Sequence, residues 1–237
     1  MDQQSLKEKT ANGLFWGGLS TGIQQLLSLV FGIFLARILT ADDYGVVGML
    51  TIISLIATSL QEGGFVAALV NKKEVNHKDY NAVFWFSMLA GLFLYVVLFF
   101  CAPLIATFYH APELVSLAHL SFLCLPISAL GIASRAFLFR NLKVKEISIT
   151  SVSALIISGI AGVIFACNGM SYWGIAIQNI IFIFLITLFT CYFSHWHPTL
   201  SINFKPLREM ISFSYKLLVT GIFMTINNNL FAVLLGK

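Results

Sequence analysis

Charged residues are scarce in this sequence. Only 10% of its 237 residues are Asp, Glu, Lys or Arg, whereas ordinary soluble domains carry about 25%. So few charged side chains cannot supply the hydrated surface that a soluble domain of this length needs. The net charge of +4 is also too small and too scattered to indicate nucleic-acid binding. A soluble globular domain and a nucleic-acid-binding protein are therefore both excluded.

Metal-ligand and catalytic patterns are missing as well. The four cysteines lie in or beside apolar runs without a CxxC pair, which is typical of buried thiols. His195 and His197 have no third ligand nearby, so no metal site is expected there. There is no GxSxG, Walker A or HExxH motif. We therefore expect no enzyme, no cofactor, and no transport driven by ATP bound to this chain.

Apolar residues are what the sequence has in abundance. They make up 58% of the chain and include 22 Phe, and the mean hydropathy is +0.88. Disordered chains are polar and poor in aromatic residues, so this composition excludes disorder. It predicts an integral membrane protein.

Seven apolar runs are long enough to cross the hydrocarbon core of a bilayer, which takes about 20 residues. They are Leu14–Arg37, Tyr44–Val70, Ala82–Phe108, Leu114–Phe137, Ile147–Cys167, Tyr172–Phe193 and Ser212–Leu235. None of them alternates strictly between apolar and polar residues, which disfavours a β-barrel. Pro103 and Pro126 fall inside the third and fourth runs and should kink them. The sequence thus predicts an all-α membrane protein, a multi-pass helical bundle.

The placement of Lys and Arg predicts the orientation of the bundle. With the N-terminus in the cytoplasm, eleven of these residues fall on the cytoplasmic side and two on the outer side. Loops on the cytoplasmic side of membrane proteins carry an excess of Lys and Arg. We therefore expect a cytoplasmic N-terminus and a location in the inner (cytoplasmic) membrane.

A weak internal repeat suggests how the chain is divided. Leu19–Ile23 in the first run is similar to Leu218–Ile222 in the seventh, at an offset of 199 residues. The seventh helix would then begin a second copy of the unit that the first helix begins. We expect a six-helix transmembrane lobe at 1–195, a cytoplasmic connector at 196–210 and the first helix of a second lobe at 211–237.

Several stretches resemble one known family. The segment Leu35–Gly45 reads LARILTADDYG and resembles the LAR-x-L-T-P-x-D-[FY]-G signature of polysaccharide-type transporters, with Ala41 in place of the usual Pro. Further similar segments follow in the family's order: Glu62–Val70, Asp79–Phe84, Ala136–Arg140 and Phe213–Leu218. These transporters are the O-antigen and exopolysaccharide lipid flippases of the multidrug/oligosaccharidyl-lipid/polysaccharide exporter superfamily.

The resemblance implies a fold and a function. Members of the family usually have two six-helix lobes that face each other across a central cavity. They are taken to move an undecaprenyl-pyrophosphate-linked oligosaccharide to the outer leaflet by alternating access. This chain then resembles the N-terminal lobe of a flippase for O-antigen, capsule or exopolysaccharide repeat units. Its implied partners are the lipid-linked oligosaccharide, membrane lipids and a second lobe.

The pyrophosphate of such a cargo needs cations along a polar path through the membrane. The candidate substrate-binding residues are Arg37, Arg135, Arg140 and Lys216. Each has a plainer alternative role. Arg37 and Lys216 can snorkel to the membrane interface, and Arg135 and Arg140 can be anchors on the cytoplasmic side.

Glu62 is the only acid deep within an apolar run. A carboxylate inside the membrane is costly, which makes it a functional candidate by default. We consider two roles for it, coupling to a proton or cation and pairing with a neighbouring helix. The amides Gln178 and Asn179 fit either sugar hydroxyls or hydrogen bonds between helices.

Two other functions remain open at this stage. A multidrug exporter of the same superfamily should favour acidic cavity residues, whereas Arg37, Arg135 and Lys216 near span ends favour the flippase. The second is a non-transporting fragment, or an assembly partner for polysaccharide-synthesis enzymes. The length of the chain favours it, because seven helices are too few to close the cavity of a two-lobe exporter.

Overall fold

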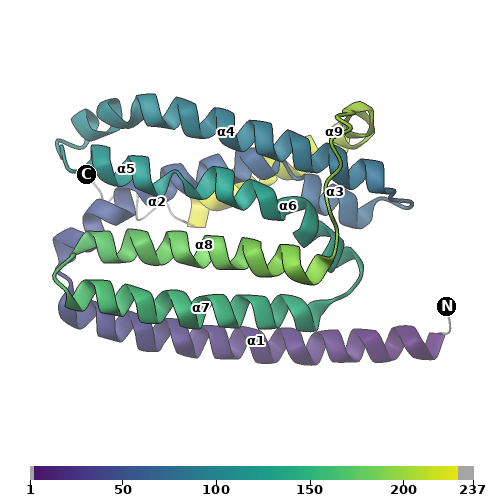
Figure 1. Cartoon of the computed structure of the whole chain (residues 1–237), viewed down its shortest axis with the longest axis horizontal. Helices are drawn as coiled ribbons and strands as arrows, with labels where there is room; N and C mark the ends of the chain where they lie inside the picture. Colours follow the sequence, from purple (N-terminus) through teal and green to yellow (C-terminus); the bar gives the residue numbers. More distant parts are fainter. Residues whose placement is uncertain (1–2, 229–237) are drawn as a thin grey trace.

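The computed structural model describes residues 3–228 (Figure 1). Within that range the chain forms nine helices and no strand. They are α1 (Gln3–Ile38), α2 (Ala41–Glu62), α3 (Phe65–Asn71), α4 (His77–Phe108), α5 (Leu114–Ser121), α6 (Cys124–Arg140), α7 (Val144–Cys167), α8 (Tyr172–Ser194) and α9 (Lys205–Asn228).

Six helical segments of the described chain are long and apolar enough to cross a membrane. They are Ala11–Ile38, Ala41–Asn71, His77–Phe108, Leu114–Arg140, Val144–Cys167 and Tyr172–Ser194. Each contains one of the first six runs that the sequence predicts as spans. The prediction of an all-α, multi-pass membrane protein is therefore confirmed.

The second predicted span is two helices rather than one. Gly63 and Gly64, at φ +55° and +72°, separate α2 from α3. Residues with a Cβ are disfavoured at such φ values, so two consecutive glycines are suited to this break. The Gly63 N–H donates to the Ser59 carbonyl over 3.1 Å and closes the last turn of α2. The chain thus turns immediately after Glu62.

The two prolines act differently. Pro126 lies in the first turn of α6 and has no N–H for the Phe122 carbonyl, and the helix is interrupted at residues 122–123, between α5 and α6. Pro103 lies inside α4, which continues to Phe108. The Phe99 carbonyl, four residues before Pro103, lies 3.2 Å from His119 Nε2 of α5, and the His119 ring stacks on the Phe99 ring with centroids 3.9 Å apart. A side chain therefore replaces the hydrogen bond that Pro103 removes.

The seventh predicted span is described only in part. α9 begins at Lys205, inside the segment predicted as connector, because Asn203 Oδ1 accepts the Lys205 N–H over 3.0 Å and Pro206 follows in the first turn. Its apolar part within the described residues is Ser214–Met224. Positions 229–235 of the predicted span lie outside the described residues, and the division at 195 and 210 stays a prediction.

The helices pack in a fixed order across the bundle. α1 lies along α7, α7 along α8, α8 along α6, and α6 along α4, while α9 contacts α2, α3 and α4 (Figure 1). The spans alternate in direction, so the N-terminus and the α3–α4, α6–α7 and α8–α9 connections share one end. Of the eleven Lys and Arg residues predicted to be cytoplasmic, nine have side chains that the structure describes. All nine lie at this end: Lys72, Lys73, Lys78, Arg135, Arg140, Lys143, Lys145, Lys205 and Arg208. We call it the basic end.

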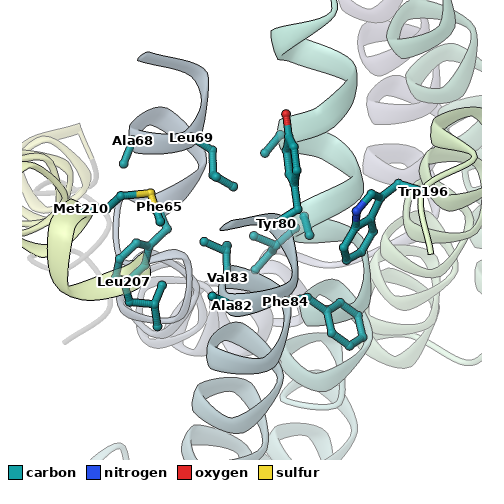
Figure 2. Close-up of a cluster of buried hydrophobic side chains, with 13 residues drawn as sticks. Phe65, Ala68, Leu69, Tyr80, Ala82, Val83, Phe84, Trp196, Leu207 and Met210 are labelled. Carbon is teal, nitrogen blue, oxygen red and sulfur yellow. The ribbon is translucent and has the colours of Figure 1, made fainter. Parts of the chain in front are cut away.

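A hydrophobic core at the basic end joins the lobe to α9. Figure 2 shows Val83 and Phe84 of α4 between Trp196 on one side and Leu207 and Met210 of α9 on the other. Other buried members come from α3, α4 and α6: Phe65, Ala68, Leu69, Tyr80, Ala82, Ile132, Ala133 and Ala136. Burial of this apolar surface holds the start of α9 against the lobe.

The connector between α8 and α9 lies across the start of α4 and is hydrogen-bonded to it. The Asn81 side chain, 2% exposed, donates to the Ser201 carbonyl over 2.7 Å and accepts the Thr199 N–H over 2.8 Å. Trp85 Nε1 donates to the Thr199 carbonyl over 2.9 Å. The connector forms neither a helix nor a strand, so its backbone groups need other hydrogen-bond partners, and these side chains of α4 supply them.

Candidate functional site

Glu62 and Arg135, two of the residues predicted to be functional, form an ion pair. Arg135 Nη2 of α6 lies 2.8 Å from Glu62 Oε1. The Arg135 side chain is 42% exposed and the Glu62 side chain is 27% exposed, so the pair is partly buried. Glu62 is the last residue of α2, where the free carbonyls of the helix end disfavour a carboxylate. Arg135 therefore compensates a negative charge that its own helix end does not stabilise.

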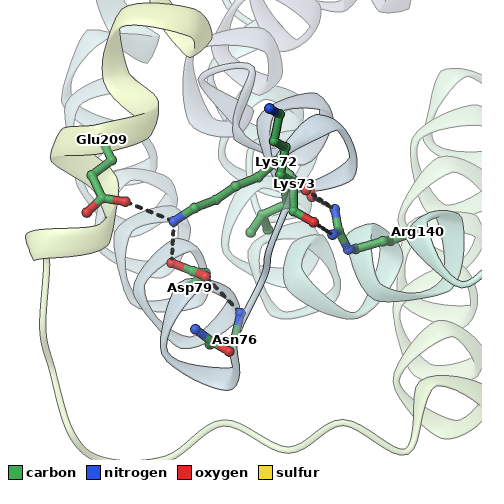
Figure 3. Close-up of polar contacts among 7 residues, drawn as sticks. Lys72, Lys73, Asn76, Asp79, Arg140 and Glu209 are labelled. Atoms are coloured by element: carbon green, nitrogen blue, oxygen red, sulfur yellow. Dashed lines mark hydrogen bonds and ion pairs between the residues drawn. The ribbon is translucent and has the colours of Figure 1, made fainter.

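Arg140 is engaged with the backbone at the end of α3. Its Nη1 donates to the carbonyls of Leu69, Val70 and Lys72 over 2.8, 3.0 and 2.6 Å. Its Nη2 donates to the Lys73 carbonyl over 3.0 Å. The last carbonyls of a helix have no partner within the helix, so the guanidinium caps α3 (Figure 3). This structural role was not among the alternatives considered for Arg140.

Lys72 forms an ion-pair cluster that the sequence did not indicate. Its Nζ lies 3.0 Å from Asp79 Oδ1 of α4 and 3.0 Å from Glu209 Oε2 of α9 (Figure 3). Burial lowers the pKa of Lys72, but hydrogen bonds and attraction from the two carboxylates outweigh it, so the pKa lies above its ordinary value. Lys72 is therefore charged at neutral pH, and the stability that its raised pKa represents is lost as the pH rises through that pKa. No local pattern connects residues 137 positions apart.

Arg37 and Lys216 lie apart from this cluster. Arg37 is exposed in the last turn of α1, at the end of the bundle opposite the basic end. Lys216 is exposed on α9. Among the described residues neither side chain forms an ion pair. Asp43, close to Arg37 in sequence, instead caps α2 through Thr40 and accepts a hydrogen bond from Ser171.

A cavity of about 590 Å³ lies between α1, α2, α7 and α8. Gln178 and Asn179, the two amides singled out in the sequence, line it. Glu62 and the four candidate cations do not. Across residues 3–228, no group of three or more His, Cys, Asp or Glu side chains lies close enough together to hold a metal ion. The described chain therefore has two separate polar regions, the basic end and this cavity.

The two roles considered for Glu62 can be separated with a double-mutant cycle. We expect Glu62→Gln and Arg135→Gln each to lower the stability of the purified protein, and the double variant to regain part of the loss. The coupling energy should be about 1 kcal/mol, since the pair is partly exposed. Chemical denaturation in detergent would measure it.

Glu74→Gln is the matched control, because Glu74 is exposed and forms no ion pair among the described residues. Additive effects of Glu62→Gln and Arg135→Gln would contradict a stabilising pair. A double variant that regains stability but not transport would assign Glu62, Arg135 or both a role beyond packing.

Comparison with known proteins places these features in a family. The chain is 26% identical to the lipopolysaccharide biosynthesis protein WzxC of Escherichia coli over 98% of its own length and 48% of WzxC. It is 23% identical to the teichuronic acid biosynthesis protein TuaB of Bacillus subtilis over 98% of its length and 49% of TuaB. The succinoglycan biosynthesis transport protein ExoT of Rhizobium meliloti is 26% identical over 61% of the chain and 29% of ExoT. No solved structure matches the chain.

The chain spans about half the length, or less, of these curated relatives. Residues 34–237 match the family described as "Polysaccharide biosynthesis protein". That match extends from the end of α1 through all the later spans, so it covers most of the chain. The protein is a member of the polysaccharide biosynthesis protein family.

Proposed function

We propose that this chain is the N-terminal lobe of an exporter that moves a lipid-linked oligosaccharide across the inner membrane. The cargo would be an undecaprenyl-pyrophosphate-linked repeat unit of O-antigen, capsule or exopolysaccharide. The observation that carries the proposal is the similarity along 98% of the chain to proteins named for lipopolysaccharide and teichuronic acid biosynthesis. ExoT, similar over a shorter range, is named as a transport protein.

The basic end supports this proposal through its charge. Nine Lys and Arg residues gather there, where a pyrophosphate would enter if the N-terminus is cytoplasmic. The Lys72 and Arg140 contacts show that some of these charges have structural roles. Arg135 is 42% exposed despite its ion pair, which leaves it the best-placed candidate to meet a phosphate.

Transport by alternating access needs a second lobe. A six-span bundle leaves many apolar side chains exposed, including Leu14, Phe15 and Phe100, and lipid or a second lobe would cover them. We expect the second lobe to face the first across a central path, with α9 as its first helix. Glu62 is the candidate for coupling to a proton or cation, since it is the only acid deep within an apolar run.

Genetic complementation tests the proposal. The complete reading frame that contains this chain should restore surface polysaccharide to a host strain that lacks its own exporter for that polysaccharide. Residues 1–237 expressed alone should not restore it, because one lobe does not enclose a path. Failure of the complete protein at normal membrane levels would sink the exporter proposal. Resistance to cationic drugs in its place would favour the multidrug exporter.

A further inference from the structure

The cavity between α1, α2, α7 and α8 is lined by hydroxyl and amide side chains as well as apolar ones. Its volume of about 590 Å³ is within the range of small-molecule sites, about 300–1,000 Å³. Eight polar side chains from five helices line it. They are Ser28, Thr51, Ser54, Thr58, Ser121, Ser158, Gln178 and Asn179, besides the Tyr44 phenol.

No Asp, Glu, Lys, Arg or His is among the residues that line this cavity. A phosphate would be left without a cation, and a metal ion without a carboxylate, so both fit it poorly. Hydroxyls and carboxamides, by contrast, both donate and accept hydrogen bonds. We propose that the cavity binds an uncharged sugar ring of the transported oligosaccharide, a site that rests on the proposed export function.

Two of the lining hydroxyls, both on α2, are arranged as acceptors. Thr51 Oγ1 donates to the Val47 carbonyl over 2.9 Å, and Thr58 Oγ1 donates to the Ser54 carbonyl over 2.8 Å. Each hydroxyl proton is thus used within its own helix, while oxygen lone pairs remain for a ligand hydroxyl. A sugar, which carries several O–H donors, matches such a wall.

The opposite wall depends on two glycines of α7. A Cβ at Gly159 would lie 2.3 Å from Phe31 Cε2, and a Cβ at Gly162 would lie 2.4 Å from Gln178 Oε1. Phe31 and Gln178 both line the cavity. They can pack against α7 because glycine has no side chain at positions 159 and 162. Gln178 Oε1 is buried and has no hydrogen-bond partner among the described residues. This oxygen lies against Gly162 of α7, so a ligand hydroxyl would reach it only after the Gln178 amide turned about its last torsion. A buried unpaired oxygen is costly, which favours such a turn when a ligand is present.

Aromatic rings complete the match to a sugar. Phe31, Tyr44 and Phe182 line the cavity beside the polar groups. Binding sites for small molecules combine apolar and aromatic walls with a few placed polar groups. A sugar ring has hydroxyls at its rim and C–H groups on its faces, so it presents both surfaces at once.

Replacement of threonines that keeps side-chain shape tests the proposal in the complete protein. The double variant Thr51→Val/Thr58→Val removes two hydroxyls from the cavity. Surface polysaccharide at equal membrane levels should fall by about tenfold, as the loss of two ordinary hydrogen bonds would produce. Gln178→Leu should lower it as well.

The matched control is Thr21→Val/Thr107→Val. Thr21 and Thr107 donate to the carbonyls of Gly17 and Pro103 in the same way, but they lie outside the cavity, and this variant should keep wild-type export. Cavity variants within twofold of the control would overturn the sugar site alone. Failure of the wild-type protein to export would overturn the export function and this site together.

Thiol labelling tests whether the cavity admits water and polar ligands. In a complete protein with its cysteines replaced, Ser54→Cys should react with a hydrophilic maleimide at least about tenfold faster than Leu89→Cys. Leu89 is 51% exposed on the outside of the bundle, where lipid would cover it. Equal rates at the two positions would show a cavity closed to polar ligands and would overturn the proposal.

Discussion

Replacing Arg140 with alanine should cost the protein about 3 kcal/mol or more of unfolding free energy. The guanidinium donates four hydrogen bonds to backbone carbonyls at the end of α3. Hydrogen bonds from a charged donor contribute about 1.5–3 kcal/mol each, and they are not additive. The midpoint of thermal unfolding in detergent should fall by about 6–12 °C for a chain of this size.

Two further variants show whether capping is the cause. Lys143→Ala removes a basic residue at the same end whose side chain forms no hydrogen bond or ion pair among the described residues, and it should be nearly neutral. Arg140→Lys keeps the charge but lacks the planar fork of donors, so most of the loss should persist. A lysine variant as stable as the wild type would indicate that charge, rather than capping, is what Arg140 provides.

Adding one methyl group at Gly64 should loosen α9 from the lobe. A Cβ at Gly64 would lie 2.6 Å from the Ser214 carbonyl oxygen and 3.1 Å from Leu217 Cβ, both on α9. The backbone of α9 must move to admit it. The φ of +72° adds about 1–2 kcal/mol of strain for a residue with a side chain.

Gly63→Ala is a closely matched control for Gly64→Ala. Gly63 also has a positive φ, at +55°, but its Cβ would meet the rings of Phe65 at 3.0 Å and Phe86 at 3.6 Å, and a ring shifts more easily than backbone. We expect Gly64→Ala to be about 1–3 kcal/mol less stable than Gly63→Ala. Thermal unfolding measures this difference.

Proteolysis reports on α9 itself. In Gly64→Ala the connector at 195–204 should be cut faster than in Gly63→Ala, because its bonds to α4 depend on the docking of α9. Equal cutting and equal stability would contradict the inference that the Gly64 contact holds α9 in place.

The six confirmed spans show how much of the fold is encoded locally. A run such as Tyr172–Phe193 is apolar apart from a few polar side chains, so only a helix satisfies its backbone within a membrane. The break before Pro126 is also local, since a proline cannot bond to the carbonyl four residues earlier. The glycine pair at 63 and 64 is visible in the sequence and could have suggested a break between two helices. What makes the break is the positive φ at both positions, which only the structure shows.

The candidate site was predictable in residue type and not in pairing. Glu62 and Arg135 were both identified, yet the sequence left open whether Glu62 meets a neighbouring helix, and the 2.8 Å contact joins residues on different helices. Arg140 was expected to be an anchor or a phosphate ligand, whereas it caps α3. The Lys72 cluster joins three segments, and the polar side chains that line the cavity come from five helices. The sequence therefore carried no local signal for either, beyond singling out the amides Gln178 and Asn179.

The sequence by itself determined that this chain is a helical membrane protein, where its first six spans lie, and that most of its basic residues gather at one end. Hydropathy, proline chemistry and charge act over a few residues, so they can be read along the chain. Only the tertiary structure decided which charges neutralise each other, which arginine caps a helix, and where hydroxyls from separate helices meet. Those contacts depend on helix packing, which brings together residues as distant as Lys72 and Glu209.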